Sequence, residues 1–195
     1  MSATKCLREE HEVILRVLGF FTQALDQASS AGEVTSAVFD PFVRFFQGFA
    51  DHCHHCKEES RLFPALEDVG MPRDAGPIAV MLDEHEQGRA LVGRIAASLE
   101  AADVGDDAAR EEVLEAGRQF VSLLSGHIDK EDQVLFNMAD DMLQGAATGM
   151  LLDGYNEEES AAGYYDTYRS CSQIVRDLAQ IYDEPQGNGP PLRVL

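Results

Sequence analysis

Residues 54–63 read HHCKEESRLF and residues 127–136 read HIDKEDQVLF, so the pattern H-x-x-K-E-[ED]-x-x-L-F occurs twice in the chain. In an α-helix, residues four apart lie one above the other on the same face. Each copy therefore directs an imidazole and a carboxylate at one point. These pairs are His54 with Glu58 and His127 with Glu131. The repeat predicts two helices that carry the same pair of metal-ligating side chains.

The segments around the two copies are rich in Ala, Leu, Glu and Arg and show helical periodicity, with no convincing strand. Asp40 is a natural N-cap for the helix that carries the first copy, and Pro41 suits its first helical position. Four long helices are expected, at about residues 5–28, 40–69, 77–102 and 106–143. Long helices with short connections predict an all-α, antiparallel up-down four-helix bundle.

A further helix is expected after the bundle. The stretch QGAATGMLLDG (residues 144–154) indicates a connection, and an amphipathic fifth helix follows at about residues 155–182. We predict a bundle over residues 1–145, a helical extension that packs on it over residues 146–184, and a flexible tail over residues 185–195. The Pro and Gly content of the tail is typical of irregular structure. The acidic sequence NEEES in the extension indicates a solvated face rather than an extra ligand such as Glu159.

Composition restricts the classes of partner. A formal net charge of −20 disfavours nucleic acid and anionic membrane surfaces. No apolar run approaches the roughly 20 residues of a membrane span, and the N-terminal sequence lacks the apolar segment of a signal peptide. We therefore expect a cytoplasmic protein with reduced cysteines, without nucleic-acid or membrane partners. The sequence leaves open whether the chain forms a homo-oligomer.

Two more histidines lie on apolar helical stripes. His11 lies on the stripe of the first helix and His85 on that of the third, so each long helix directs one imidazole inward. In the fourth helix, the same spacing places Val134 and Met138 on the face of His127. Buried imidazoles and carboxylates are costly unless they bind a cation. Because iron accepts mixed nitrogen and oxygen ligands, we predict a two-iron site with open positions for small molecules.

The sequence resembles the hemerythrin-like, HHE cation-binding domains. The resemblance covers about residues 7–140 and rests on EEHEVI around His11, CHHCKEESRLFPAL, MLDEHEQGRALV around His85, and HIDKEDQVLFNMAD. It implies a four-helix bundle with a non-haem di-iron centre, oxo- or hydroxo-bridged, that reacts with oxygen or related small molecules. The ligands that it implies are His11, His54, His85 and His127 as terminal ligands, with Glu58 and Glu131 as bridges.

Two features depart from the oxygen-carrying hemerythrins. The carriers have a fifth histidine four residues from that of the third helix, where this chain has Met81 and Arg89. One imidazole is thus missing, which favours a more open, reactive or sensing centre over a reversible oxygen carrier. The carriers also place the last carboxylate five residues after its histidine, which makes Asp132 the alternative to Glu131. The internal repeat favours Glu131.

The helix of the first copy contains two conflicting periodicities. Its phenylalanines share a seven-residue rhythm with Glu59, and this rhythm turns His54 and Glu58 away from the apolar stripe. These phenylalanines are Phe42, Phe45, Phe49 and Phe63. We favour the internal repeat, interpret the phenylalanines as a second buried surface, and keep His55 with Glu59 as the next candidate pair.

Cys53 and Cys56 form a CxxC pattern, which alone indicates zinc or dithiol chemistry. No second CxxC completes a zinc site and no βαβ pattern surrounds it, so we interpret both as core or near-core residues.

The sequence as a whole predicts a di-iron protein that binds or activates O2, peroxide or nitric oxide, in oxidative or nitrosative stress or in iron handling. One alternative is a non-catalytic oxygen or iron sensor that uses the same centre. Another is a structural bundle with hydrogen-bonded core histidines. The sequence leaves open whether the protein is an enzyme.

Overall fold

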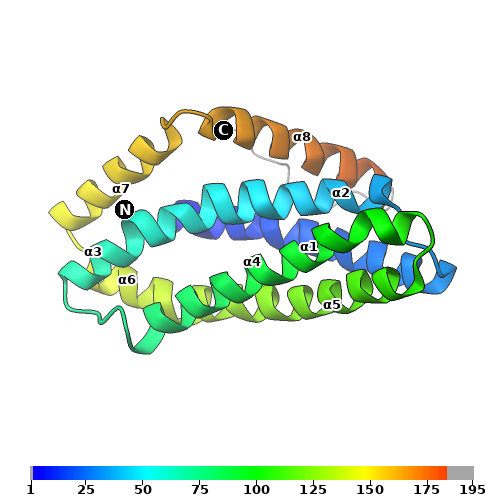
Figure 1. The fold of residues 1–195 in the computed structure, drawn as a ribbon. Helices are drawn as coiled ribbons and strands as arrows, with labels where there is room; N and C mark the ends of the chain where they lie inside the picture. Colours follow the sequence, from blue (N-terminus) through cyan, green and yellow to red (C-terminus); the bar gives the residue numbers. More distant parts are fainter. Residues whose placement is uncertain (1, 184–195) are drawn as a thin grey trace.

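The computed structural model describes residues 2–183, which form helices and connections without a β-strand. Four long helices run up and down beside one another (Figure 1). The first and third are α1 (Lys5–Ala31) and α4 (Gly76–Asp103). The second long helix comprises α2 (Ser36–Phe45), π-helical segments at Phe46–His55 and Glu58–Leu62, and α3 (Phe63–Asp68). The fourth comprises α5 (Asp107–Lys130), a π-helical segment at Glu131–Leu135, and α6 (Phe136–Met142).

The predicted all-α class and the four-helix bundle are confirmed, with further helical structure after the bundle. Helix α1 ends where Gly32 adopts a left-handed φ of 70° and its N–H bonds to the carbonyl of Ala28. Helix α5 begins after Asp106, whose carboxylate accepts a 3.0 Å hydrogen bond from the N–H of Ala109. Local capping chemistry therefore sets these two boundaries.

The second long helix begins earlier than the sequence predicted. Its first residue is Ser36, and its N-cap is Thr35 rather than Asp40. Pro41 therefore lies inside the helix. The extra turn is stabilised by burial of Phe39, whose ring packs edge-on against that of Phe21 at 6.0 Å. A proline this close to a helix start removes a single hydrogen bond, and core packing offsets that loss.

The C-terminal extension contains two helices where the sequence predicted one. They are α7 (Ala146–Glu159) and α8 (Tyr164–Tyr182), separated at Gly163, whose φ is 88°. The expected connection is helical because Leu151 and Tyr155 are buried in the apolar cluster beside the bundle. The predicted tail at residues 185–195 lies outside the described residues.

Both helices of the extension lie along one side of the bundle, next to the second long helix (Figure 1). Helix α8 approaches closely at Gly48, where a Cβ would lie 2.8 Å from Cys171 Sγ. Helix α7 approaches at Gly154, where a Cβ would lie 3.1 Å from Arg61 Cδ. Most of NEEES is exposed, as predicted, and all three of its glutamates pair with Lys57 or Arg61.

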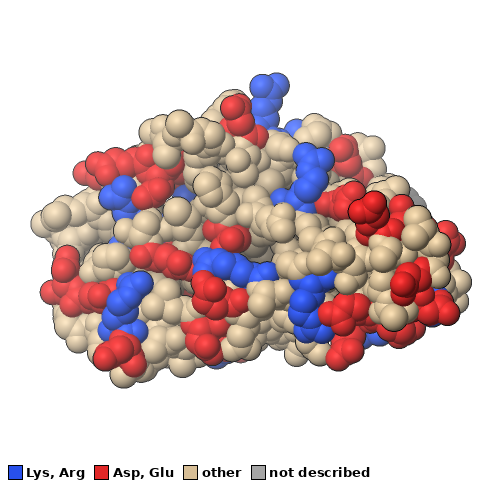
Figure 2. Space-filling view, viewed as in Figure 1, with Lys and Arg blue, Asp and Glu red and all other residues tan. Residues whose placement is uncertain are grey.

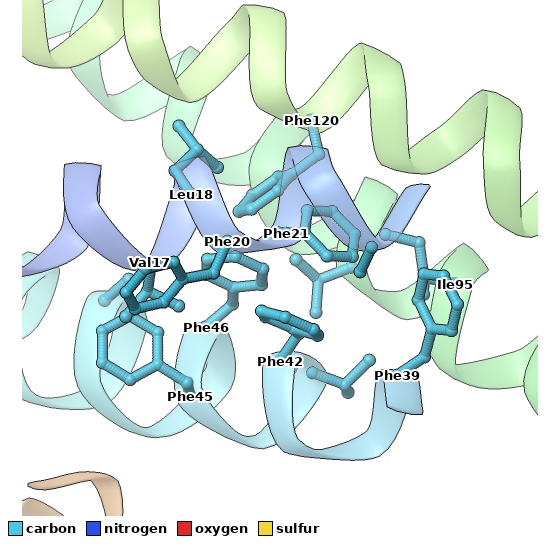
Figure 3. Close-up of a cluster of buried hydrophobic side chains, with 14 of the residues drawn as sticks. Val17, Leu18, Phe20, Phe21, Phe39, Phe42, Phe45, Phe46, Ile95 and Phe120 are labelled. Carbon is cyan, nitrogen blue, oxygen red and sulfur yellow. The ribbon is translucent and has the colours of Figure 1, made fainter. Parts of the chain in front are cut away.

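Two apolar clusters fill the bundle, with a polar layer between them. The larger one includes a group of phenylalanines from α1, α2 and α5 (Figure 3). The smaller one includes Leu7, Phe63, Ile78 and Phe136 and continues under α7. Along α1, His11 lies between Leu7 of the smaller cluster and Ile14 of the larger. The histidines are therefore enclosed by apolar side chains above and below.

The π-helical segments change which residues face the interior. In a π-turn the N–H bonds to the carbonyl five residues earlier, so one extra residue rotates later side chains by about 100°. The N–H of Phe63 bonds to the carbonyl of Glu58, and the N–H of Phe136 bonds to that of Glu131. Both turns therefore follow the glutamates of the sequence repeat.

π-Helical rotation explains two results that regular α-helical spacing does not. In the second long helix, the π-helical segment at Phe46–His55 lets Phe49, His54 and Glu58 all be buried, so the phenylalanine stripe and the repeat no longer conflict. In the fourth, the prediction that Val134 and Met138 face inward is wrong, because they are 49% and 38% exposed. Their neighbours one residue on, Leu135 and Ala139, are buried instead.

Acidic side chains spread over the face shown in Figure 2, with lysine and arginine side chains among them. Among residues 2–183, no helix is both long and apolar enough to cross a membrane.

Gly117 in α5 provides a test of helix packing. A Cβ there would lie 2.6 Å from Leu25 Cδ2 and 3.3 Å from Phe21 Cζ. We expect Gly117→Ala to lower the free energy of unfolding by about 1–3 kcal/mol, because the core must move to accept the methyl group. Chemical denaturation of the metal-free protein measures this change.

Gly126 in the same helix is the matched control, since no atom lies within 4 Å of its Cβ position. Gly126→Ala should raise the free energy of unfolding by about 0.5–1 kcal/mol through helix propensity. Equal effects of the two substitutions would contradict the close approach of α1 and α5.

Candidate metal centre

Seven buried side chains from the four long helices meet in the polar layer. Their donor atoms form two groups, and within each group all lie within 4.8 Å of one another. The first position comprises His11, His54, Glu58 and Glu131. The second position comprises His55, Glu58, His85 and His127. The structure thus brings together the six side chains that the sequence singled out first, together with His55.

The imidazole nitrogens are spaced as ligands of a common ion are. Nε2 of His11 lies 3.0 Å from Nε2 of His54, and Nε2 of His85 lies 3.2 Å from Nε2 of His127. Two ligand atoms that each lie about 2.1 Å from one ion, at right angles, are about 3.0 Å apart. Each imidazole pair therefore has the spacing of neighbouring ligands on a single metal ion.

Glu58 and Glu131 lie between the two imidazole pairs. One oxygen of Glu131 lies 3.2 Å from Nε2 of both His11 and His127, and the oxygens of Glu58 lie 3.6 and 3.5 Å from the other two imidazoles. None of the four carboxylate oxygens has a hydrogen bond of acceptable geometry, although both side chains are fully buried. Such atoms are costly to bury, and a pair of cations between the carboxylates would satisfy them.

The Nδ1 atoms of four imidazoles bond to carboxylates on neighbouring helices. The pairs are His11 with Asp132 (3.0 Å), His54 with Glu10 (2.9 Å), His85 with Glu59 (2.7 Å) and His127 with Glu84 (3.0 Å). These bonds form a closed ring, in which every long helix donates to one neighbour and accepts from another. We call them the Nδ1 ring.

The Nδ1 ring determines what the cluster presents to its interior. An ionised carboxylate only accepts hydrogen bonds, so Nδ1 carries the proton and the Nε2 lone pair of a neutral imidazole faces inward. Two lone pairs about 3 Å apart repel each other unless a proton or a metal ion lies between them. The hydrogen-bond pattern therefore fits a metal at each imidazole pair.

Sequence reasoning missed Glu10 and Glu84. The signal was present, because each directly precedes an inward histidine, in EEHE and in DEHE. Glu59 and Asp132, which the sequence kept as alternative ligands, belong to the Nδ1 ring and to neither donor group. Each contacts the histidine of another helix, and sequence spacing cannot reveal such a contact.

Each shared position of the repeat has the same contacts in both helices. The lysines bond to the carboxylates that hold the histidines of their own helices, Lys57 to Glu10 and Lys130 to Glu84. The final phenylalanines stack on the histidines of the other two helices, Phe63 on His85 at 6.0 Å and Phe136 on His11 at 5.2 Å. The repeat therefore encodes one half of the centre, and two copies complete it.

His55 breaks this twofold arrangement. Its counterpart in the second copy is Ile128, and its ring stacks on that of His85 with centroids 3.8 Å apart. Both of its ring nitrogens are buried without a hydrogen bond, and Nδ1 lies 3.6 Å from Asp51 Oδ1. The third helix has no fifth histidine, as the sequence indicates, but the second long helix places the imidazole of His55 in the second donor group.

The metal-free cluster holds its charges unevenly. Burial lowers the pKa of His54, His55 and His85. It acts in the same direction on His11 and His127, but contacts with the carboxylates outweigh it and raise the pKa of both to about 9.

The carboxylates show the same imbalance. Burial raises the pKa of Glu58 to about 7. Burial also opposes ionisation of Glu131, but the imidazoles of His127 and His11 lower its pKa well below the usual range. Protons thus take the place of cations in the metal-free protein.

A cavity of about 240 Å³ lies beside the second position. His55, His85 and His127 form part of its wall, and exposed Gln47 forms another part, so it links the cluster to the surface. Most of the remaining wall is apolar and includes Phe46, Val92, Phe120 and Leu124. A small uncharged molecule fits this lining better than an ion does.

The CxxC cysteines take no part in either donor group. Cys53 is fully buried in the larger apolar cluster, and burial raises the pKa of its thiol to about 12. Cys56 lies nearer the surface, with Sγ 3.9 Å from a carboxylate oxygen of Glu158. Because only a thiolate is a good metal ligand or nucleophile, this geometry disfavours a zinc or dithiol site.

A four-helix bundle that encloses imidazoles and carboxylates without hydrogen bonds is typical of a cation-binding helical protein. The chain belongs to the hemerythrin HHE cation-binding domain family, whose model matches residues 2–139. That range contains the cluster and the Nδ1 ring, whereas α7 and α8 lie beyond it.

Among curated proteins, an uncharacterized protein of Mycobacterium tuberculosis (strain ATCC 25618 / H37Rv) is 24% identical over 190 residues. The alignment covers 95% of this chain and 73% of the relative. An uncharacterized protein of Mycobacterium bovis matches with the same identity and coverage. No solved structure matches the chain significantly.

Metal binding to the cluster should release protons. His11 and His127 have pKa values of about 9, so both are protonated at pH 7.5 in the metal-free protein. A metal ion needs the unprotonated nitrogen, so we expect the release of about two protons per chain. The affinity for Zn²⁺ should rise with pH and level off near pH 9.

Calorimetric titrations with Zn²⁺ in buffers of different ionisation enthalpy measure the protons released. Binding enthalpies that are the same in all buffers at pH 7.5 would contradict the proposed protonation of these imidazoles.

Proposed function

We propose that the protein is a non-haem di-iron protein that binds or activates a small molecule, namely O2, peroxide or nitric oxide. One observation carries the proposal: two buried carboxylates without hydrogen bonds lie between imidazole pairs whose Nε2 atoms face each other. Iron suits this mixture of nitrogen and oxygen donors, and bundle cores commonly hold di-iron carboxylate sites. The membership of the HHE family supports cation binding here.

In this proposal the seven donors divide into terminal and bridging ligands. His11 and His54 would hold one iron ion, and His55, His85 and His127 would hold the other, in keeping with the two donor groups. Glu58 and Glu131, which lie near imidazoles of both groups, would serve as the bridging ligands. The Nδ1 ring keeps the imidazoles in the metal-binding tautomer. When bound, the iron ions supply redox chemistry toward the small molecule.

The cavity gives the small molecule a route to the second position. The mostly apolar wall of the cavity favours uncharged molecules such as O2 and nitric oxide. The two apolar clusters close the approaches to the polar layer along the length of the bundle.

Metal analysis tests the proposal directly. We expect the purified protein to contain about two iron ions per chain, one for each donor group. Removal by a chelator should lower the melting temperature, because bound metal stabilises the folded state. Negligible metal, with a melting temperature that a chelator does not change, would favour a structural bundle instead. With iron present, turnover of peroxide or nitric oxide identifies an enzyme, and binding without turnover identifies a sensor.

Glu131→Gln provides a variant test of the bridging role. The amide cannot replace a bridging carboxylate, and loss of one bridge weakens metal binding at both positions. We therefore expect iron content to fall by about half or more. Glu115→Gln is the matched control, because Glu115 is exposed on the same long helix. Equal iron content in the two variants would refute the role assigned to Glu131.

Gly88→Leu tests the access route. Gly88 lines the cavity, and a Cβ there would make only ordinary contacts, 3.7 Å from Phe120 Cε2, so a larger side chain fills the cavity. We expect nitric oxide binding to slow by roughly tenfold, which is about 1.4 kcal/mol of barrier. Iron content should not change.

Stopped-flow absorption of the iron-loaded protein measures this rate. Gly93→Leu is the control, since Gly93 is exposed on the same helix with no atom within 4 Å of its Cβ position. Unchanged rates in both variants would rule out the cavity as the route.

A further inference from the structure

The four carboxylates of the Nδ1 ring are each bound by a cationic side chain. The pairs are Asp132 with Arg8, Glu10 with Lys57, Glu59 with Arg89, and Glu84 with Lys130. Every imidazole of the ring is thus followed outward by a carboxylate and then by a cation. The arrangement repeats four times, so any difference among the four cations distinguishes one histidine from the others.

Lys57 differs from the other three cations in burial. The side chains of Arg8, Arg89 and Lys130 are 31%, 31% and 43% exposed, whereas that of Lys57 is 1% exposed. Water screens the first three, but it does not screen Lys57. The interaction of Lys57 with Glu10, at 2.5 Å, is therefore screened less by water than the other three pairs of the ring.

Lys57 also has a second carboxylate, and the C-terminal extension supplies it. Glu159, the last residue of α7, lies 2.6 Å from Lys57 Nζ. Tyr164, at the start of α8, places its ring 5.4 Å from the same nitrogen. Both residues lie outside residues 2–139, which the family model matches. A continuous chain of contacts thus runs from the extension through Lys57 and Glu10 to His54, whose Nδ1 lies 2.9 Å from Glu10.

We propose that Glu159 is a positioning residue through which the C-terminal extension sets the metal affinity of the first position. The inference rests on the proposed metal site. Because Lys57 contacts Glu159 as well as Glu10, it neutralises less of the negative charge of Glu10. Glu10 is then a stronger hydrogen-bond acceptor for the N–H of His54. A stronger acceptor at Nδ1 makes Nε2 a better metal ligand. Without Glu159, Lys57 interacts with Glu10 alone and weakens that acceptor.

Cobalt titrations of the metal-free full-length chain test this inference, because Co²⁺ bound by imidazoles absorbs visible light. We expect Glu10→Gln to lower the affinity for one of two Co²⁺ ions by about 10–100-fold, the usual effect of removing a carboxylate that holds a metal-ligating histidine. Glu159→Gln should lower the affinity for the same ion by up to about tenfold and shift the absorption bands of that ion. The other ion should bind as in the wild type.

Glu157→Gln is the matched control. Glu157 lies on the same helix and pairs with Arg61 at 3.2 Å, and its side chain is 69% exposed. This variant loses the same charge but should bind both Co²⁺ ions as the wild type does. Glu159→Asp keeps the charge and should retain most of the wild-type affinity, which separates an electrostatic role from a purely structural one.

The double variant Glu10→Gln/Glu159→Gln shows whether Glu159 acts through Glu10. If it does, the double variant binds Co²⁺ no more weakly than Glu10→Gln alone. Additive losses, or Glu159→Gln binding and absorbing as Glu157→Gln does, would overturn the inference while leaving the metal site intact. A wild-type protein that binds no Co²⁺ would overturn the proposed function and this inference together.

Discussion

The hydrogen bonds from four histidine Nδ1 atoms to carboxylates on neighbouring helices are the interactions on which the centre depends. They turn every Nε2 atom toward the cluster, and they link the four long helices in a closed ring. The same bonds therefore orient the ligands and fix the helices that carry them. The ring encloses two carboxylates without hydrogen bonds, and cations are the simplest groups that satisfy both these oxygens and the facing imidazoles.

The centre has a twofold plan with two departures from it. Each copy of the repeat contributes a histidine, a glutamate, a lysine and a stacking phenylalanine, and α1 and α4 contribute one histidine and one glutamate each. His55 adds an imidazole beside one position, next to the cavity. Lys57, a buried cation bound by Glu10 and by the partly exposed Glu159, lies beside the other. The two donor groups are thus chemically different, although the helices that form them are related.

Apolar packing isolates this polar layer and makes its electrostatics strong. The larger cluster lies on one side of the histidines and the smaller cluster on the other, so Glu58 and Glu131 are fully buried between them. Burial raises the pKa of Glu58 to about 7, whereas the imidazoles of His127 and His11 overcome burial and lower the pKa of Glu131 well below its usual range. The π-turns that follow both glutamates keep the phenylalanines and the ligands on the same interior face.

The sequence by itself determined the all-α class, the four-helix bundle and the inward direction of His11, His54, His85 and His127, because these follow from spacing along single helices and, for His54, from the internal repeat. Only the tertiary structure decided the π-turns, the place of His55, the helical state of residues 146–154 and the partners of Glu10 and Glu84. Each of these depends on contacts between helices, and periodicity along one helix carries no information about them. The repeat could reveal which side chains share a face, but not which neighbouring helix that face meets.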